Sequence, residues 1–125
     1  MLAEPYNSLF NRLSTKIPLD RLITDPLRTL AYGTDASFYR LVPRLIVKVE
    51  NETEALAVLS ACREHNTAVT FRAAGTSLSG QALSDSVLMV LGPKGWRNYQ
   101  ISADRSEITL GAGILGAEAN RYLAP

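Results

Sequence analysis

The sequence contains a single cysteine, Cys62, and a single histidine, His65. One thiol cannot form an internal disulfide, and one cysteine with one histidine supplies too few nitrogen and sulfur ligands for a zinc site. Long apolar runs are also missing: none approaches the roughly 20 residues that span a bilayer, and the first ten residues lack the basic and apolar regions of a signal peptide. These absences predict a metal-free protein with no membrane span, located in the cytoplasm.

An excess of one charge is absent as well. Thirteen basic and twelve acidic residues nearly cancel along 125 residues, and they are scattered rather than clustered. A nucleic acid or an anionic membrane surface would require a concentrated basic patch, so neither is an expected partner. Hydrophobic residues make up 46% of the chain, which is enough for a modest core in one small globular unit. We expect a small-molecule ligand.

The first 32 residues have a weak helical pattern that is interrupted by Pro5, Pro18 and Pro26. Proline breaks helix interiors, so the pattern predicts several short helices on the surface. Residues 33–37 follow as a turn or loop, because their small polar side chains can bond to nearby backbone.

The signals become stronger after Pro43. Residues 45–49 are short and β-branched, which predicts a strand, and Asn51 with Glu54 resembles the capping box of a helix that ends near residues 65–66. A second strand is expected at residues 68–71, and this order and spacing are typical of a parallel crossover. Further strands are expected at residues 86–91, 99–102 and 107–110, before a helix that begins near Leu115.

The loop at residues 72–81 follows directly after a predicted strand and is rich in small residues. Gly75 and Gly80 can adopt positive φ, and the hydroxyls of Thr76, Ser77 and Ser79 are additional donors. Such a loop can form a concave nest of backbone N–H groups that binds phosphate oxygens. An ordinary surface turn has a similar composition, and composition alone leaves both interpretations open. Neither a Gly-x-Gly-x-x-Gly nor a Gly-Lys-Ser/Thr motif is present.

The segment Arg-x-x-Gly-Thr-Ser-Leu-Ser-Gly-Gln at residues 72–81 is similar to the pyrophosphate loop of the vanillyl-alcohol-oxidase-like FAD-binding domain, also called the PCMH-type domain. Residues 32–39, together with Pro43, resemble the lead-in of bacterial FAD-linked D-lactate and related 2-hydroxyacid dehydrogenases. Residues 111–114, followed by residues 120–125, resemble the next passage from strand to helix in that domain. The sequence departs from the family pattern at Ala73 and Ala74, where glycines are usual, and at residues 50–51, where a proline is usual.

The resemblance implies FAD as cofactor and an α+β fold. That fold would comprise a small parallel βαβ sheet flanked by helices, plus the first antiparallel strands of a second subdomain. A helical lead-in is expected at residues 1–40 and the first portion of the FAD-binding domain at residues 41–125. The cofactor-binding residues that the resemblance implies are Arg72, Ala73, Ala74, Gly75, Thr76, Ser77, Leu78, Ser79, Gly80, Gln81, Gly111, Ala112, Gly113 and Ile114.

Relatives of this family are longer, so the resemblance implies that Pro125 is a truncation point and that the rest of the parent enzyme is a partner. The parent would oxidise a small 2-hydroxyacid such as D-lactate, and its catalytic histidines would lie outside this chain. A second hypothesis is a non-catalytic fragment that folds without flavin and self-associates through exposed strand edges. Cys62 and His65 lie on or beside an amphipathic helix, where packing or solvation is their expected role.

Two further pairs of residues are assigned to structure rather than to chemistry. Asp35 and Arg72 are candidates for a structural pair or a loop anchor. Trp96 and Tyr99 follow a Gly-Pro-Lys-Gly turn and are expected to be packing residues.

Overall fold

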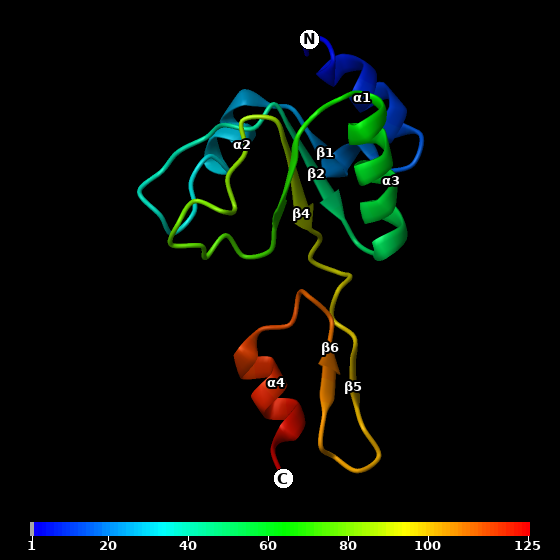
Figure 1. The fold of residues 1–125 in the computed structure, drawn as a ribbon, viewed down its shortest axis with the longest axis vertical. Coiled ribbons are helices and arrows are strands. Elements are labelled where there is room, and N and C mark those ends of the chain that lie inside the picture. Colours follow the sequence, from blue (N-terminus) through cyan, green and yellow to red (C-terminus); the bar gives the residue numbers. More distant parts are fainter. Residues whose placement is uncertain (1) are drawn as a thin grey trace.

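A computed structural model describes residues 2–125, and its elements form two parts that follow each other along the long axis (Figure 1). The first and larger part contains a sheet flanked by helices: α1 (Tyr6–Ser14), the 3-10 helix η1 (Leu19–Arg21), β1 (Leu22–Ile23), α2 (Pro26–Ala31), β2 (Leu45–Val49), α3 (Glu52–Glu64), β3 (Val69–Arg72) and β4 (Val87–Leu91). The second part contains β5 (Tyr99–Ile101), β6 (Ile108–Leu110) and α4 (Gly116–Leu123). The predicted α+β class and the order of the predicted elements after Pro43 are confirmed.

The sheet of the first part has the strand order β1-β2-β4-β3. β2 and β3 run parallel, as the crossover predicted, but they are not neighbours, because β4 lies between them and pairs in parallel with both. β1 pairs with β2 in the antiparallel direction. The carboxyl ends of β2, β3 and β4 therefore lie along one edge of the sheet, where ligands of parallel sheets commonly bind.

The central strands β2 and β4 are buried on both faces, which explains why each is a continuous apolar run rather than an alternating pattern. One face packs against α1 and α3 through alternate strand residues, including Leu45, Val47, Val49, Val87 and Met89. The opposite face carries a smaller cluster of Ile23, Ile46, Leu88 and Val90, with Tyr32 packed against it. Cys62 belongs to the larger cluster, and burial raises the pKa of its thiol, in agreement with the predicted packing role.

The amino-terminal segment corrects the prediction of short surface helices. Leu9 and Leu13 on α1, and Ile17 after it, are at most 1% exposed and belong to the main core. Leu22 and Ile23 form a strand instead of part of a helix, because their backbone pairs with β2. Both features depend on contacts with residues far away in the sequence, which a local helical pattern does not report.

The second part is thin. β5 and β6 form an antiparallel two-stranded hairpin, and α4 lies beside it with no buried residue. The rings of Tyr99 and Tyr122 stack with centroids 4.0 Å apart, which joins the hairpin to the helix. Tyr99 is thus a packing residue, as predicted. A two-stranded hairpin with one helix buries little apolar surface, so its position depends strongly on the junction with the first part.

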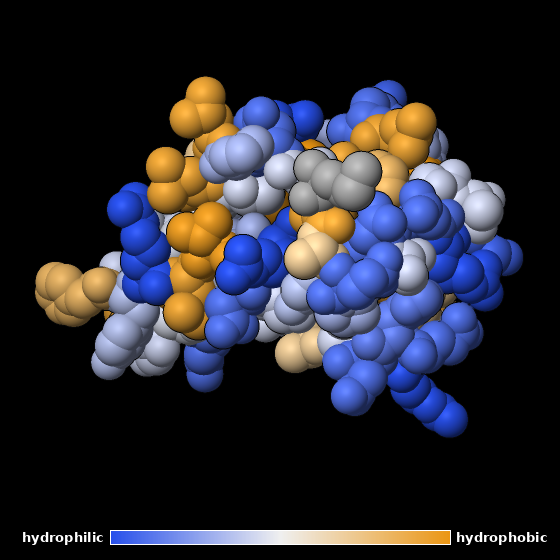
Figure 2. Space-filling model, turned by 90° about the horizontal axis from the view of Figure 1, so that it is seen from above, coloured by the Kyte–Doolittle hydropathy of each residue, from blue (hydrophilic) through white to orange (hydrophobic). Residues whose placement is uncertain are grey.

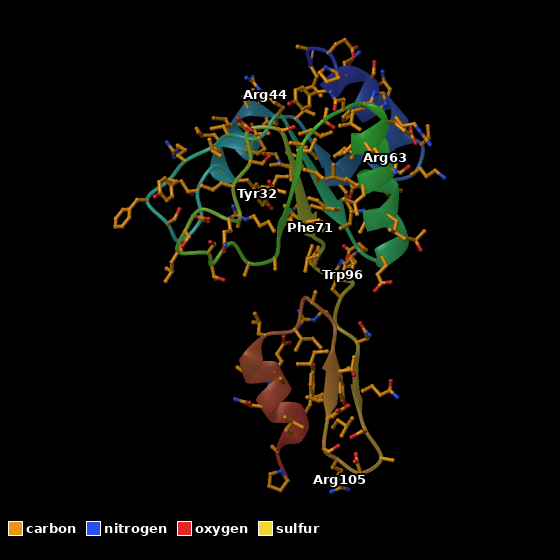
Figure 3. All side chains as sticks on the ribbon, in the orientation of Figure 1. Tyr32, Arg44, Arg63, Phe71, Trp96 and Arg105 are labelled. Carbon is orange, nitrogen blue, oxygen red and sulfur yellow. The ribbon has the colours of Figure 1, made fainter. Side chains whose placement is uncertain are left out.

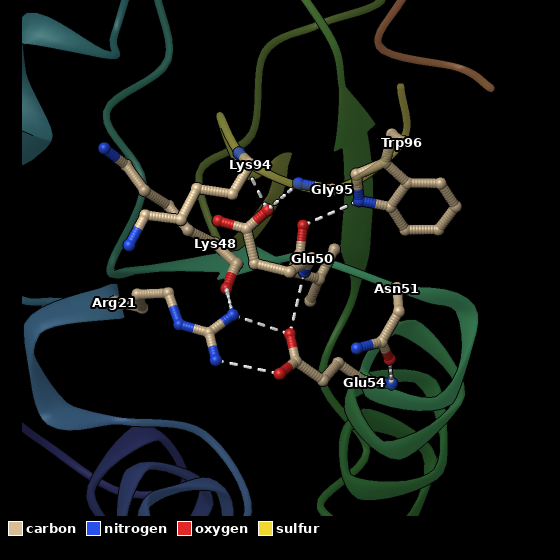
Figure 4. Close-up of polar contacts among 9 residues, drawn as sticks. Arg21, Lys48, Glu50, Asn51, Glu54, Lys94, Gly95 and Trp96 are labelled. Atoms are coloured by element: carbon tan, nitrogen blue, oxygen red, sulfur yellow. Dashed lines mark hydrogen bonds and ion pairs between the residues drawn. The ribbon is translucent and has the colours of Figure 1, made fainter. Parts of the chain in front are cut away.

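Trp96 lies at the junction between the two parts (Figure 3). Its indole Nε1–H donates to the Val49 carbonyl at 2.8 Å, and its ring packs against the main core, which confirms its predicted packing role. The Glu50 carboxylate accepts hydrogen bonds from the backbone N–H groups of Lys94 and Gly95 (Figure 4). The end of β2 therefore fixes the chain that leads from β4 into the hairpin.

Helix α3 begins as predicted, with the Asn51 side chain accepting a hydrogen bond from Glu54 N–H at 2.9 Å. The Glu54 carboxylate turns back to the N–H of Glu50, at 2.8 Å, and accepts two bonds from the Arg21 guanidinium, at 2.6 and 2.8 Å. A proline at position 50 would remove the donor of the first of these bonds. The Arg21 pair links the amino-terminal segment to α3 and to the end of β2 (Figure 4).

The Glu54 interaction predicts a dependence of stability on acid. Hydrogen bonds from Arg21, then the bond from Glu50 N–H and the charge of Arg21, hold the pKa of Glu54 below its ordinary value of 4.5. A carboxyl with a lowered folded-state pKa contributes stability that is fully present above the ordinary pKa and is lost as the pH falls through the folded value. We expect Glu54→Gln to cost about 1–2 kcal/mol at neutral pH and less in acid.

Urea unfolding at neutral pH and below pH 4.5 measures this difference. Glu52→Gln is the matched control, because Glu52 lies in the same helical turn and is exposed. An equal loss of stability for Glu54→Gln at both pH values would contradict the assignment.

Between residues 2 and 125, no helix is long and apolar enough to cross a membrane.

Candidate functional site

The loop at residues 72–81 leaves the carboxyl end of β3, the strand at one side of the sheet. Its first residue, Arg72, ends that strand opposite Val90 of β4. The predicted position of the loop, at the carboxyl end of a parallel strand, is therefore confirmed. From there the chain crosses the sheet edge and returns to begin β4.

Two glycines shape the loop as expected. Gly75 has φ of 70° and Gly80 has φ of 75°, both in the left-handed region that favours glycine. The Ser77 hydroxyl oxygen accepts hydrogen bonds from Ser79 N–H at 3.2 Å and from Gln81 N–H at 3.1 Å, which closes the turn between the glycines. Ala73 and Ala74 have negative φ, so an alanine methyl causes no backbone strain at those positions.

The backbone N–H groups of residues 73–78 have no hydrogen-bond acceptor anywhere in the part of the chain that the structure describes. Most residues of this stretch are exposed, and Gly75 and Ser77 are half-buried. Nearly all backbone donors in folded proteins are paired, so a consecutive run of free donors in a turn with positive φ is the arrangement that binds an anion. This loop therefore fits the pyrophosphate group of FAD, because phosphate oxygens accept several hydrogen bonds at once.

The lead-in resemblance places residues 32–39 beside the loop, and the structure brings them into contact. Ala36 N–H donates to the Gly75 carbonyl at 3.1 Å. The Tyr39 ring packs against Gly80, where an added Cβ would lie 3.0 Å from Tyr39 Cδ2. A shallow hollow of about 310 Å³ adjoins this contact, lined by Tyr39, Arg40, Leu41, Ser79, Gly80 and Leu83. Sequence analysis assigned no site role to Tyr39, although the family resemblance included it.

Exposed apolar side chains continue from this hollow along the same side of the molecule. Figure 2 shows apolar atoms gathered where α2 lies in Figure 1. The exposed large apolar residues of α2 and the chain that follows are Leu27, Leu30, Phe38, Tyr39, Leu41 and Val42. The lead-in thus has one polar contact with the loop and an apolar outer surface.

Asp35 and Arg72 do not form the ion pair that their pairing suggested. Arg72 donates to the backbone carbonyls of Tyr32 and Thr34, at 3.2 and 2.8 Å, and so anchors the loop. Asp35 Oδ1 accepts from Ser37 N–H at 2.8 Å, and this bond, aided by the positive charge of Arg72, lowers the pKa of the carboxyl. The anchor prediction is confirmed for Arg72, while Asp35 caps its own turn.

Residues 111–114 lie between β6 and α4 and pack against the Trp96 junction. Gly111 N–H donates to Asn98 O at 2.7 Å, and Gly113 N–H donates to Trp96 O at 2.8 Å. A Cβ on Gly111 would lie 2.5 Å from the Trp96 carbonyl carbon, so this position requires glycine for close approach. No hydrogen bond within residues 2–125 connects residues 111–114 to the loop at residues 72–81.

Three comparisons with known proteins agree with this geometry. The sequence pattern of a family described as FAD binding domain matches residues 43–125. D-2-hydroxyglutarate dehydrogenase of Escherichia coli is 28% identical over 99 residues, which are 77% of this chain and 10% of that protein. The chain therefore spans a small share of this relative.

The fold is similar to those of larger solved structures. p-Cresol methylhydroxylase superposes with a TM-score of 0.81 at 12% identity, and alkyldihydroxyacetonephosphate synthase with a TM-score of 0.78 at 15% identity. Each match covers 98% of this chain and 25% of the other one. Because the family pattern covers well over half of the sequence and its cofactor is FAD, the chain belongs to the FAD binding domain family.

Proposed function

We propose that the loop binds the pyrophosphate of FAD through the backbone N–H groups of residues 73–77, with Ser79, Gly80 and Gln81 as further contacts. The observation that carries this proposal is the run of unpartnered, accessible N–H groups that begins at the carboxyl edge of the sheet. Its orientation depends on positive φ at Gly75 and Gly80. An anion with several acceptor oxygens is the ligand that satisfies such a run.

We further propose that residues 111–114 line the cofactor site nearer the ribityl chain or the flavin ring. This assignment is supported by the resemblance to the family, and by the close packing that holds the segment against Trp96. Of these residues, Ala112 is the one whose backbone N–H has no acceptor among the described residues. A polar contact from this segment would therefore come from Ala112.

For the whole protein we propose oxidation of a small 2-hydroxyacid, such as D-lactate, in the cytoplasm. Bound FAD would supply the hydride acceptor, and this chain would bind and orient it. The support is the likeness to D-2-hydroxyglutarate dehydrogenase, whose named substrate is a 2-hydroxyacid. None of the residues in this chain is assigned a catalytic role.

Incubation with excess FAD, followed by gel filtration and a visible spectrum, tests cofactor binding for both the full-length protein and the 125-residue chain. We expect flavin absorbance to elute with the full-length protein. A full-length protein that elutes without flavin and shows no change in thermal stability with FAD would contradict the proposal.

The same gel filtration tests the second hypothesis, that the chain alone self-associates without flavin. The observation that favours it is the open side of β3, where Phe71 is 55% exposed and no further strand pairs within the described residues. An elution volume larger than a dimer requires, with no bound flavin, would reject self-association and flavin binding for the isolated chain together.

A further inference from the structure

The side chain of Arg72 turns away from the free N–H groups of the loop and toward the lead-in segment. Its Nη1 donates to Thr34 O at 2.8 Å and to Tyr32 O at 3.2 Å, and it lies 3.5 Å from Ala82 O. The guanidinium carbon is 5.4 Å from the centroid of the Tyr32 ring. All three acceptors are neutral carbonyls, from two segments that are far apart in the sequence.

The guanidinium also occupies the inner side of the turn at Gly75. A Cβ built on Gly75 would lie 2.6 Å from Arg72 Cζ and 2.8 Å from Nε, which is closer than real Cβ contacts. The turn therefore closes directly onto the guanidinium plane. The hydrogen bond from Ala36 N–H to Gly75 O fastens the same turn to the lead-in from the other side.

The charge of Arg72 is balanced at a distance rather than by an ion pair. Asp35 is the nearby carboxylate, and no Arg72–Asp35 contact falls within ion-pair distance in the described part of the chain. Asp35 Oδ2 is buried and has no hydrogen-bond partner there. A carboxylate with a spare buried acceptor favours a cation beside it, and it leaves the guanidinium donors free for the carbonyls.

We propose that Arg72 is a positioning residue, whose planar guanidinium holds residues 32–36 against the loop so that the N–H groups of residues 73–77 face the cofactor. This proposal rests on the proposed FAD binding by the loop. It changes the role of Arg72 from a cofactor contact to a support behind the contacts. The geometry of the fork matters more than its charge, because the acceptors are uncharged carbonyls.

The test compares Arg72→Ala and Arg72→Lys with the wild type in the full-length protein, by titration of the apo form with FAD. Lysine keeps the charge but cannot bridge both carbonyls and lie flat under Gly75. We expect both variants to bind FAD roughly 10- to 100-fold more weakly. Low millimolar guanidinium should restore part of the affinity of Arg72→Ala, whereas equal methylammonium should not. Arg63→Ala, an exposed change on α3, is the matched control and should bind as the wild type does.

Hydrogen exchange on the apo protein separates this inference from the proposed function. In both Arg72 variants the Ala36 N–H should exchange faster than in the wild type, because its bond to Gly75 O depends on the support. Wild-type affinity in Arg72→Lys, or rescue by methylammonium as strong as by guanidinium, would show that charge alone acts and would overturn the proposal. Unchanged exchange at Ala36 would also overturn it. A wild type that binds no FAD would instead remove the proposed function, whatever the exchange shows. If Arg72→Ala does not fold, Arg72→Lys carries the test by affinity and exchange.

Discussion

Gly75→Val in the full-length protein is expected to abolish FAD retention. Gly75 has φ of 70°, a conformation that costs an L-residue about 1–2 kcal/mol and a β-branched residue more. A valine side chain would also collide with the Arg72 guanidinium, which lies within 2.8 Å of the position of the added Cβ. The loop must then open, and the free N–H groups of residues 73–78 no longer converge. We expect FAD affinity to fall at least roughly 100-fold.

Flavin content after purification and the FAD dissociation constant measure this effect. Gly116→Val is the matched control, because nothing lies within 4 Å of a Cβ at Gly116 and its φ is not positive. Normal flavin content in Gly75→Val would mean that the phosphate site lies elsewhere.

Gly95→Ala is expected to be the most destabilising small substitution at the junction between the two parts. A Cβ there would lie 2.6 Å from the Glu50 carbonyl carbon and 3.0 Å from Glu50 Cα, so it would collide with backbone that cannot rotate away. The collision would break the bonds that the Glu50 carboxylate accepts from Lys94 and Gly95. Overpacking of this kind costs about 1–3 kcal/mol, and we expect the upper end of that range.

Urea unfolding with two probes measures the effect and its location. Trp96 fluorescence reports the junction directly, since Trp96 is the one tryptophan of the sequence, and far-UV circular dichroism reports the whole chain. We expect the fluorescence transition of Gly95→Ala to precede the circular dichroism transition, because the hairpin and α4 detach first. Gly116→Ala should leave both transitions unchanged. Coincident transitions at the wild-type midpoint would contradict the assigned role of Gly95.

The elements after Pro43 were predictable because their signals are local. β2 is a β-branched run next to a helix whose first turn carries its own cap at Asn51, and the structure reproduces both. Gly75 and Gly80 were predictable for the same reason, since positive φ is a property of the single residue. The first 32 residues were not, because the strand pairing of Leu22 and the burial of Leu9 depend on distant partners.

The sequence by itself determined the family, the cofactor class and the small-residue loop after a strand, since all three depend on residue identity and spacing along the chain. Only the tertiary structure decided the neighbours. It placed β4 between β2 and β3, directed Arg72 to the carbonyls of the lead-in instead of to Asp35, and left the N–H groups of residues 73–78 without partners. The physical reason is that strand order, the choice of hydrogen-bond acceptor and the absence of one depend on which segments meet in space, and local sequence does not encode those meetings.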